Sequence, residues 1–224
     1  DVLAILTQLH DVSERKKIAE IQKESNLRLE ESNLKLKNKI IDGLRAQEQI
    51  HHFVYYDALT GVSNRKKMLE EIGLLLLEKN EKFAILFIDL DKFKSANDNY
   101  GHQAGDNILK VAALRLKKII KSTDTISRIG GDEFIIILRN LKSIQNAEKI
   151  AEAALEQLNI AFIYMNNKLF VGGCIGISIF PEHGIDADTL IKNADSAMYE
   201  VKREGGNRYR VYSNNLNLNI MQNL

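Results

Sequence analysis

The feature that most constrains the fold of this chain is a short acidic turn between two apolar runs. The turn is Gly130-Gly131-Asp132-Glu133, and five apolar residues, Phe134 to Leu138, follow it directly. Apolar runs that flank glycine and aspartate are typical of a β-hairpin, because glycine readily adopts the positive φ angles of a tight turn. We therefore expect a hairpin that presents Asp132 and Glu133 at its tip.

The chemistry of this tip admits two interpretations. Carboxylate oxygens are the ligands that Mg²⁺ prefers, and glycines without side chains let a polyanion approach the backbone closely. An ordinary solvated turn has the same composition, because glycine and aspartate are common turn residues. The hairpin alone does not decide between a metal and phosphate site and a structural turn.

Composition restricts the class of protein. With 224 residues, 45% of them hydrophobic, the chain can bury one substantial core and still extend beyond it. A net charge of +1 gives no general field for nucleic acid or an anionic membrane, so we expect neither as a partner. The single cysteine, Cys174, lies in an apolar run and fits a small buried residue in a reducing compartment. No apolar run reaches membrane-spanning length, and we expect a cytoplasmic chain whose full-length protein has any membrane tether upstream.

Two segments are expected before the main domain. Residues 2 to 9 are apolar enough to predict a short strand, and Ser13 is a candidate cap for the helix that follows it. From Lys16 to about Tyr55 there is no proline and only one glycine, which predicts a long helix. The strand and the residues 11 to 16 after it resemble the end of a PAS sensor domain. This resemblance implies that residues 1–15 are the remnant of a sensor upstream.

Apolar residues recur in the predicted helix at seven-residue spacing. Such heptads are typical of a coiled coil and predict a homodimer through residues 16–55, while a long helix packed on its own domain is the alternative. The two series are Leu27, Leu34, Ile41 and Leu29, Leu36, Ile50.

The remaining sequence, residues 56–213, alternates helices and strands, and residues 214–224 are expected to be a flexible tail. We place the domain boundary near Phe53. Alternation of this kind predicts an α+β fold with a mostly antiparallel sheet flanked by helices. Because the strand 83–89 ends in Asp89, that carboxylate is expected beside Asp132 and Glu133 in one sheet. The predicted helices are 65–78, 106–120, 143–158 and 187–203, and the predicted strands are 83–89, a hairpin at 161–171 turning at 166–167, 173–180 and 208–212.

Three motifs occur in order along this domain. They are Asp57-Ala58-Leu59-Thr60-Gly61-Val62-Ser63-Asn64-Arg65, then Asp89-x-Asp91-x-Phe93-Lys94-x-x-Asn97-Asp98-x-x-Gly101-His102-x-x-Gly105-Asp106, then Arg128-x-Gly130-Gly131-Asp132-Glu133-Phe134. Together they resemble the GGDEF domain of diguanylate cyclases, from about Phe53 to Tyr212. The resemblance implies a palm-like fold of the ferredoxin-like, nucleotidyl-cyclase type. It also implies synthesis of cyclic di-GMP from two GTP molecules with release of pyrophosphate.

The resemblance assigns catalytic roles to Asp89, Asp132 and Glu133. The resemblance implies that these residues hold Mg²⁺ or Mn²⁺, two ions per site, with the backbone carbonyl of Leu90 as a further ligand. Two cations clamp the attacking and leaving oxygens of an in-line displacement. Asp132 is also a candidate for helping to deprotonate the ribose 3′-OH.

The resemblance implies further contacts with GTP. Asn97 and Asp106 match the residues that read guanine, and a carboxylate suits the N1 and N2 donors that adenine does not offer in that arrangement. His102 either lies near the substrate or orders its own loop. Asp91 is expected to cap a short helix starting at Lys92. Arg128 either positions the hairpin or is a solvated strand residue. Phosphate contacts are implied for Phe93, Lys94 and Lys202.

Two positions depart from the family pattern. The product-inhibition motif of the family, Arg-x-x-Asp, reads Lys121-Ser122-Thr123-Asp124, and lysine lacks the planar fork that binds phosphate bidentately. Gly206 stands where a phosphate-binding arginine is common, with Arg203 and Arg208 as possible substitutes. Because of the lysine, we expect weak or absent product inhibition at the site of Lys121 and Asp124.

A catalytically silent module that binds GTP or a cyclic dinucleotide is the alternative to an active cyclase. It predicts the loss of a metal or guanine residue, and none is lost. A purely structural dimerisation element leaves the carboxylates unexplained, and an enzyme that uses an adenine nucleotide conflicts with Asp106.

Overall fold

The computed structural model describes residues 2–78 and 82–213, so the predicted tail at 214–224 lies outside the described residues. The chain divides into two compact units, Asp1–His52 and Phe53–Leu224, and each is described by itself. Among the described residues, no helix combines the length and the apolarity needed to cross a membrane.

The first unit is formed by helix α1, Val2–Tyr55, which continues for a few residues into the second unit. The strand predicted for residues 2 to 9 is wrong, and Ser13 lies inside α1 instead of capping it. No glycine or proline separates residues 2 to 9 from the following helix, and their leucines, alanine and glutamine have high helix propensity, so the helix continues through them. The strand on which the resemblance to a PAS sensor depended is thus replaced by helix.

The apolar heptad residues of α1 are exposed in the single chain. The exposed fractions of their side chains range from 46% for Ile41 to 64% for Ile50. These six large apolar side chains thus expose about half of their surface or more in the single chain.

The second unit is built on a six-stranded sheet with the order β1-β3-β4-β2-β7-β8. The β3–β4, β4–β2 and β2–β7 pairs are antiparallel, whereas β1–β3 and β7–β8 are parallel. The centre of the sheet is therefore antiparallel, as expected, and its two edges are parallel. The strands are β1 Ser63–Asn64, β2 Phe83–Asp91, β3 Thr125–Gly130, β4 Glu133–Leu138, β7 Gly172–Phe180 and β8 Arg208–Val211.

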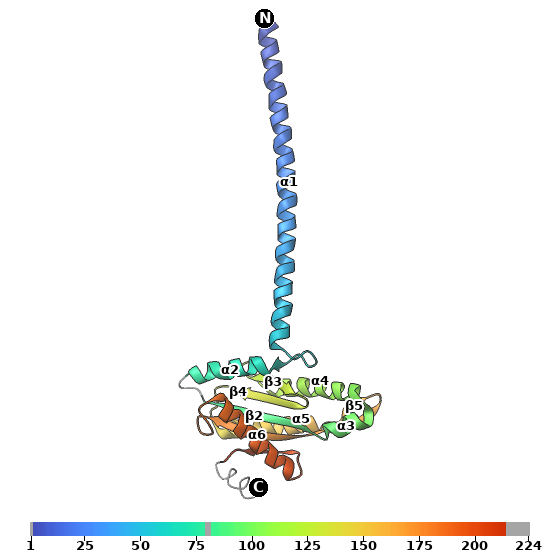
Figure 1. The fold of residues 1–224 in the computed structure, drawn as a ribbon, viewed down its shortest axis with the longest axis vertical. Helices are drawn as coiled ribbons and strands as arrows, with labels where there is room; N and C mark the ends of the chain where they lie inside the picture. The colour runs from blue at the N-terminus through green and yellow to red at the C-terminus, as the bar shows by residue number, and fades with distance from the viewer. Residues whose placement is uncertain (1, 79–81, 214–224) are drawn as a thin grey trace. The chain divides into compact units, whose positions relative to one another are not determined.

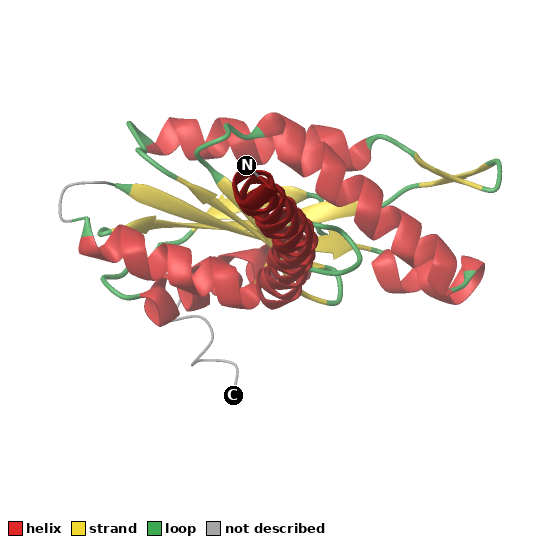
Figure 2. Ribbon diagram, turned by 90° about the horizontal axis from the view of Figure 1, so that it is seen from above, coloured by secondary structure: helices red, strands yellow, loops and turns green. Residues whose placement is uncertain are grey.

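Helices cover both faces of this sheet (Figures 1 and 2). They are α2 Arg65–Leu77, α3 Phe93–Tyr100, α4 His102–Ile119, α5 Ile144–Asn159 and α6 Ala187–Arg203, and a separate hairpin joins β5 Phe162–Tyr164 to β6 Asn167–Leu169.

Strand β2 lies in the middle of the sheet and separates two hydrophobic cores. Leu86 and Ile88 contribute to the core shared with α4 and α5, and Ile85 and Phe87 to the core shared with α2 and α6. Eight successive residues of β2 are buried, because a central strand covered on both faces has no solvent side. The apolar run in the sequence reflects this position.

The α+β class and the palm-like arrangement of a sheet flanked by helices are confirmed, and the predicted helix 187–203 coincides with α6. The short helix expected after β2 forms as α3, with Gly101 (φ 81°) between it and α4. Two details differ. Helix α4 begins at His102, four residues before its predicted start at residue 106. The β5–β6 hairpin turns at Met165 and Asn166, which both have positive φ angles, one residue earlier than predicted.

Candidate active site

The acidic hairpin forms as predicted. β3 pairs with β4 through a bulge, and Gly131 and Asp132 form the loop between them, with Gly131 at a φ of 49°. β2 runs beside β4 and places Asp89 directly opposite Glu133. The backbone N–H of Leu90 donates to the carbonyl of Asp132 at 3.2 Å, which fixes the hairpin tip to the end of β2. Asp89, Asp132 and Glu133 therefore gather at one end of the central strand.

The electrostatics of this group are unfavourable for three anions. Burial, together with the charge of Asp132, raises the pKa of Asp89 despite the hydrogen bond from Lys202. Burial and the charges of Asp89, Asp195 and Asp132 raise the pKa of Glu133. Carboxylates that raise one another's pKa in this way favour the binding of a cation.

One of these carboxylates, Asp89, already has a cationic partner in the protein. The Lys202 ammonium donates to both oxygens of Asp89, at 3.0 and 2.9 Å, and its pKa is raised by that hydrogen bond. Neither Asp132 nor Glu133 forms an ion pair with a side chain in residues 2–78 and 82–213. The site is thus only partly neutralised.

The donor set fits a divalent metal ion in its chemistry. Within the described residues, no three His, Cys, Asp or Glu side chains are spaced closely enough to form a ready-made metal site. Hard carboxylate oxygens that repel one another, with an ammonium group bound where a metal would bind, are nevertheless the donors that Mg²⁺ or Mn²⁺ requires. Asp89, Asp132 and Glu133 are therefore the side chains that could hold the ion.

The predicted guanine residues lie on the two helices that follow β2. Asn97 is on α3 and Asp106 is exposed on α4. A Cβ on Gly105 would lie only 1.8 Å from Asn97 Oδ1, so glycine at this position lets Asn97 pack directly against α4, one residue before Asp106. Asn97 Oδ1 is buried and has no hydrogen-bond partner in the described part of the chain. A buried polar atom without a partner suggests a place where a ligand completes the hydrogen bonding.

The other predicted substrate residues on these two helices are Phe93, Lys94 and His102. Phe93, the first residue of α3, packs partly buried against the core, and Lys94 is exposed beside it. His102 is exposed and begins α4, which places it in a helix and not in a loop. The prediction that Asp91 caps the short helix is wrong: Lys92 holds the cap position with a φ of 63°, and Asp91 is the last residue of β2. The left-handed backbone at Lys92 turns the chain directly from strand to helix.

Comparison with known protein families decides what this domain is. The family model described as diguanylate cyclase, GGDEF domain, matches residues 54–208. The chain belongs to the GGDEF domain family.

Relatives of this GGDEF domain carry different names. The chain is 34% identical over 157 residues to diguanylate cyclase TpbB of Pseudomonas aeruginosa, matching 68% of this chain and 36% of TpbB. It is 32% identical over 186 residues to cyclic di-GMP phosphodiesterase PdeR of Escherichia coli, matching 83% of this chain and 28% of PdeR. The chain thus spans about a third or less of the length of these relatives.

Solved structures support the fold of the GGDEF domain. A structure of TpbB that comprises only its GGDEF domain is 33% identical, with a TM-score of 0.72, and covers 75% of this chain and 99% of that one. A structure of the coiled coil and GGDEF domain of DgcB from Caulobacter crescentus, in complex with c-di-GMP, has a TM-score of 0.72 over 81% of this chain and 98% of that one. Its 23% identity shows the fold alone.

The two departures of this GGDEF domain from the family pattern have a local structure. The Asp124 carboxylate accepts from the backbone N–H groups of Lys121 and Arg139, at 3.0 and 3.1 Å, and Lys121 is exposed. Gly206 has a φ of 74°, and a Cβ there would lie 2.6 Å from Asp91 Oδ2, so an arginine does not fit this backbone without strain. Arg208 forms an ion pair with Glu204.

Sequence reasoning missed some residues of the site. Asp195 on α6 raises the pKa of Glu133, and no motif in the sequence pointed to it. Asp57 and Thr60 belong to the first motif, but only the structure shows that Asp57 forms an ion pair with Arg128, 71 residues away. In the sequence, the only sign of this pair was that the first motif contains an acidic residue and the third motif a basic one.

Proposed function

We propose that this GGDEF domain is a diguanylate cyclase that makes cyclic di-GMP from two molecules of GTP. The 3′-oxygen of each GTP forms a bond to the α-phosphorus of the other, and the bond from that phosphorus to the β-phosphate bridging oxygen breaks. Two pyrophosphates leave, and each hydroxyl group loses one proton. The observation that carries the proposal is the partly neutralised group of Asp89, Asp132 and Glu133 at the end of β2.

Each acidic residue has a role in this proposal. The carboxylates of Asp89, Asp132 and Glu133, with the carbonyl of Leu90, would hold Mg²⁺ or Mn²⁺, two per site in the family. Such ions, when bound, supply positive charge to the attacking and leaving oxygens. Asp132, at the tip of the hairpin and without an ion-pair partner among the described residues, is the candidate acceptor for the 3′-OH proton.

Basic residues at the same strand end would bind the triphosphate. Lys202 and Lys94 supply positive charge, and the backbone at Phe93 supplies N–H groups at the start of α3. Lys202 now binds Asp89, and a metal ion on that carboxylate would release its ammonium group for the phosphates.

The substrate base would be guanine. The exposed carboxylate of Asp106 can accept from guanine N1 and N2, and adenine offers no such pair of donors. The buried, unpartnered Asn97 Oδ1 supports a ligand at the same place. His102, exposed one turn before Asp106 on α4, would lie beside the substrate.

Two copies of the chain are needed for this reaction. One site binds one GTP, so joining two nucleotides requires two sites that face each other across a homodimer. The exposed heptad residues of α1 support dimerisation through that helix, because a second copy would cover them. The helix would then set how the two sites face each other and so control the rate.

The activity is tested by incubating the full chain with GTP and Mg²⁺ and separating the products by chromatography. The wild type is expected to form a cyclic dinucleotide and pyrophosphate. Asp132→Ala should lose at least about 100-fold in rate, while Glu156→Ala, which removes an exposed carboxylate from α5, should keep the wild-type rate. GTP binding by a dimeric wild type without any product would favour the silent binding module instead.

Dimerisation is tested by light scattering after size exclusion. Leu34→Asp introduces a charge into a heptad series and is expected to shift the chain toward monomer and to reduce product formation in parallel. Lys35→Asp introduces the same side chain at a neighbouring exposed position outside both series, and should leave the dimer intact. Equal dimer content in the two variants would contradict a role for the helix.

A further inference from the structure

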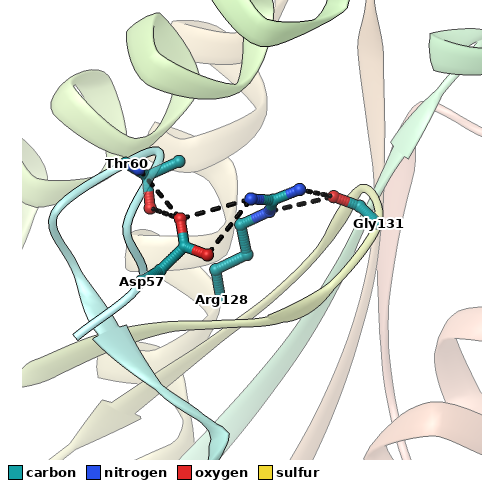
Figure 3. Close-up of polar contacts among 4 residues, drawn as sticks. All are labelled: Asp57, Thr60, Arg128 and Gly131. Atoms are coloured by element: carbon teal, nitrogen blue, oxygen red, sulfur yellow. Dashed lines mark hydrogen bonds and ion pairs between the residues drawn. The ribbon is translucent and has the colours of Figure 1, made fainter. Parts of the chain in front are cut away.

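A cluster of polar contacts joins the hairpin tip to the first turn of the domain (Figure 3). Arg128, on β3, donates from Nη1 to both carboxylate oxygens of Asp57, each at 3.2 Å. Its Nε and Nη2 groups both donate to the carbonyl oxygen of Gly131, at 3.0 and 2.7 Å. One guanidinium group thus contacts two segments that are far apart in the sequence.

Asp57 is itself held firmly. Its Oδ1 accepts from the backbone N–H of Thr60 at 2.8 Å and from the Thr60 hydroxyl at 2.6 Å. Burial raises the pKa of Asp57, but the hydrogen bonds from Thr60 and the charge of Arg128 outweigh burial, so that the pKa is lowered. The carboxylate is therefore ionised at neutral pH and remains a partner for Arg128.

The contacts are shielded and depend on geometry. The Arg128 and Asp57 side chains are only 14% and 22% exposed, so the ion pair is less screened than a surface pair. A planar guanidinium can bind two acceptors at fixed angles, whereas a lysine ammonium is a compact charge without that fork. The arrangement therefore requires arginine.

The Gly131 carbonyl is one atom of the peptide bond that leads into Asp132. The Asp132 carbonyl on the other side accepts from Leu90 N–H at 3.2 Å. The two-residue loop is thus fixed from both sides, by Arg128 before Asp132 and by β2 after it. Gly131, with its positive φ angle and exposed position, does not fix this peptide by itself.

We propose that Arg128, held by Asp57 and Thr60, is a positioning residue that fixes the Gly131–Asp132 peptide and so aims the Asp132 carboxylate at the metal. The inference rests on the proposed role of Asp132 in the cyclase. Arg128 acts through the hairpin backbone, and its charge is balanced by Asp57. The same contacts tie the tip to the turn at Asp57–Val62, which begins two residues after the end of α1.

The test compares two arginines in similar ion pairs. Arg139 pairs with Glu71 at 3.3 Å, and the two side chains are 29% and 20% exposed, but neither touches the hairpin tip. Arg128→Met and Arg139→Met therefore remove similar interactions, one at the tip and one away from it. Three quantities are measured on the full chain: the urea midpoint of unfolding, the affinity for Mn²⁺ alone by electron paramagnetic resonance, and kcat for GTP.

Both methionine variants are expected to unfold at lower urea concentration than the wild type. Only Arg128→Met should lose about 10-fold in Mn²⁺ affinity and in kcat, the size of effect seen when a group that orients a metal ligand is removed. Arg128→Lys should recover part of the stability through Asp57 but not the Mn²⁺ affinity, because lysine cannot contact Asp57 and Gly131 together.

Three results would overturn the proposal. Wild-type Mn²⁺ affinity in Arg128→Met would mean that Arg128 only stabilises the fold, and an equal loss in Arg139→Met would mean that any loosening of the domain has this effect. A wild type that does not bind Mn²⁺ would remove the metal at which Asp132 is aimed. Failure of the cyclase proposal is seen separately, as absence of product, because Mn²⁺ binding needs no turnover.

Discussion

An alanine at Gly176 is expected to displace helix α6 from the sheet and thereby to impair the active site. Gly176 lies in β7, and a Cβ on it would be 1.9 Å from the carbonyl oxygen of Ala194 and 2.4 Å from the backbone nitrogen of Met198. Both atoms belong to the backbone of α6, so no side chain can rotate away to make room. Since Cβ contacts under 3.0 Å essentially never occur, α6 must move by at least about 1.1 Å from β7.

The expected losses of stability and of rate follow from the packing of α6 and from Lys202 near its end. Overpacking of a well-packed core costs about 1–3 kcal/mol, and because the obstruction is backbone we expect a loss of about 2–3 kcal/mol in the free energy of unfolding. Lys202 lies in the last turn of α6, with its ammonium group 2.9 Å from Asp89. A misplacement of about 1 Å can cost about 100-fold in rate, so Gly176→Ala should lower the rate of product formation by roughly 10- to 100-fold.

The matched control is Gly173→Ala in the same strand. A Cβ on Gly173 would lie 2.7 Å from Leu158 Cδ1, the end of a side chain that can adjust more easily than backbone, so the cost should be at the lower end of this range, about 1 kcal/mol. Urea unfolding and product chromatography on both variants provide the comparison. Equal losses for the two alanines, or a Gly176→Ala chain as stable as the wild type, would refute the packing argument.

Three further outcomes are expected. Low concentrations of added cyclic di-GMP should leave GTP turnover unchanged, because Asp124 is already engaged by backbone N–H groups; inhibition that Asp124→Ala relieves would contradict this. Asp106→Ala should reduce the preference for GTP over ATP in kcat/KM by at least about 10-fold, and an unchanged ratio would place the guanine contact elsewhere. Burial lowers the pKa of His183, so just below pH 6.5 the unfolded chain binds more protons than the folded chain. The free energy of unfolding should therefore fall as the pH falls through this range. His183→Gln should show a flatter dependence on pH.

Much of the second unit could be predicted because its sequence patterns are local. The apolar run of β2 indicated a central strand, since a strand covered on both faces needs no polar positions. The amphipathic pattern of residues 187–203, with Leu190, Ile191, Ala194 and Met198 on one face, predicted α6 with the bounds that the structure has. Asp89 could be placed beside the hairpin because it lies near the end of β2, Glu133 begins β4, and the two strands are antiparallel neighbours in one sheet.

Other features depend on contacts that no local pattern contains. Lys202 binds Asp89 across 113 residues of sequence, and Arg128 binds Asp57 across 71. From the sequence, Arg128 could be a solvated strand residue or could position the hairpin. The residues next to it in the sequence are the same in both cases, so they do not distinguish the two roles. The prediction for residues 2 to 9 failed for a different reason. The periodicity of a short apolar segment does not distinguish strand from helix, and here the segment continues into a long helix.

The charges around the hairpin support the proposal that the site binds an added cation. Arg128 is the basic residue nearest to Asp132 in sequence, yet its charge is matched by Asp57 and its hydrogen bonds go to the Gly131 carbonyl. Among the described residues, Lys202 is then the ammonium group that pairs with the cluster of Asp89, Asp132 and Glu133. Three formal negative charges against one positive charge leave the cluster with a net negative charge, which attracts a divalent cation such as Mg²⁺ or Mn²⁺. Because Lys202 is 48% exposed, a metal ion on Asp89 can displace its side chain without opening the core.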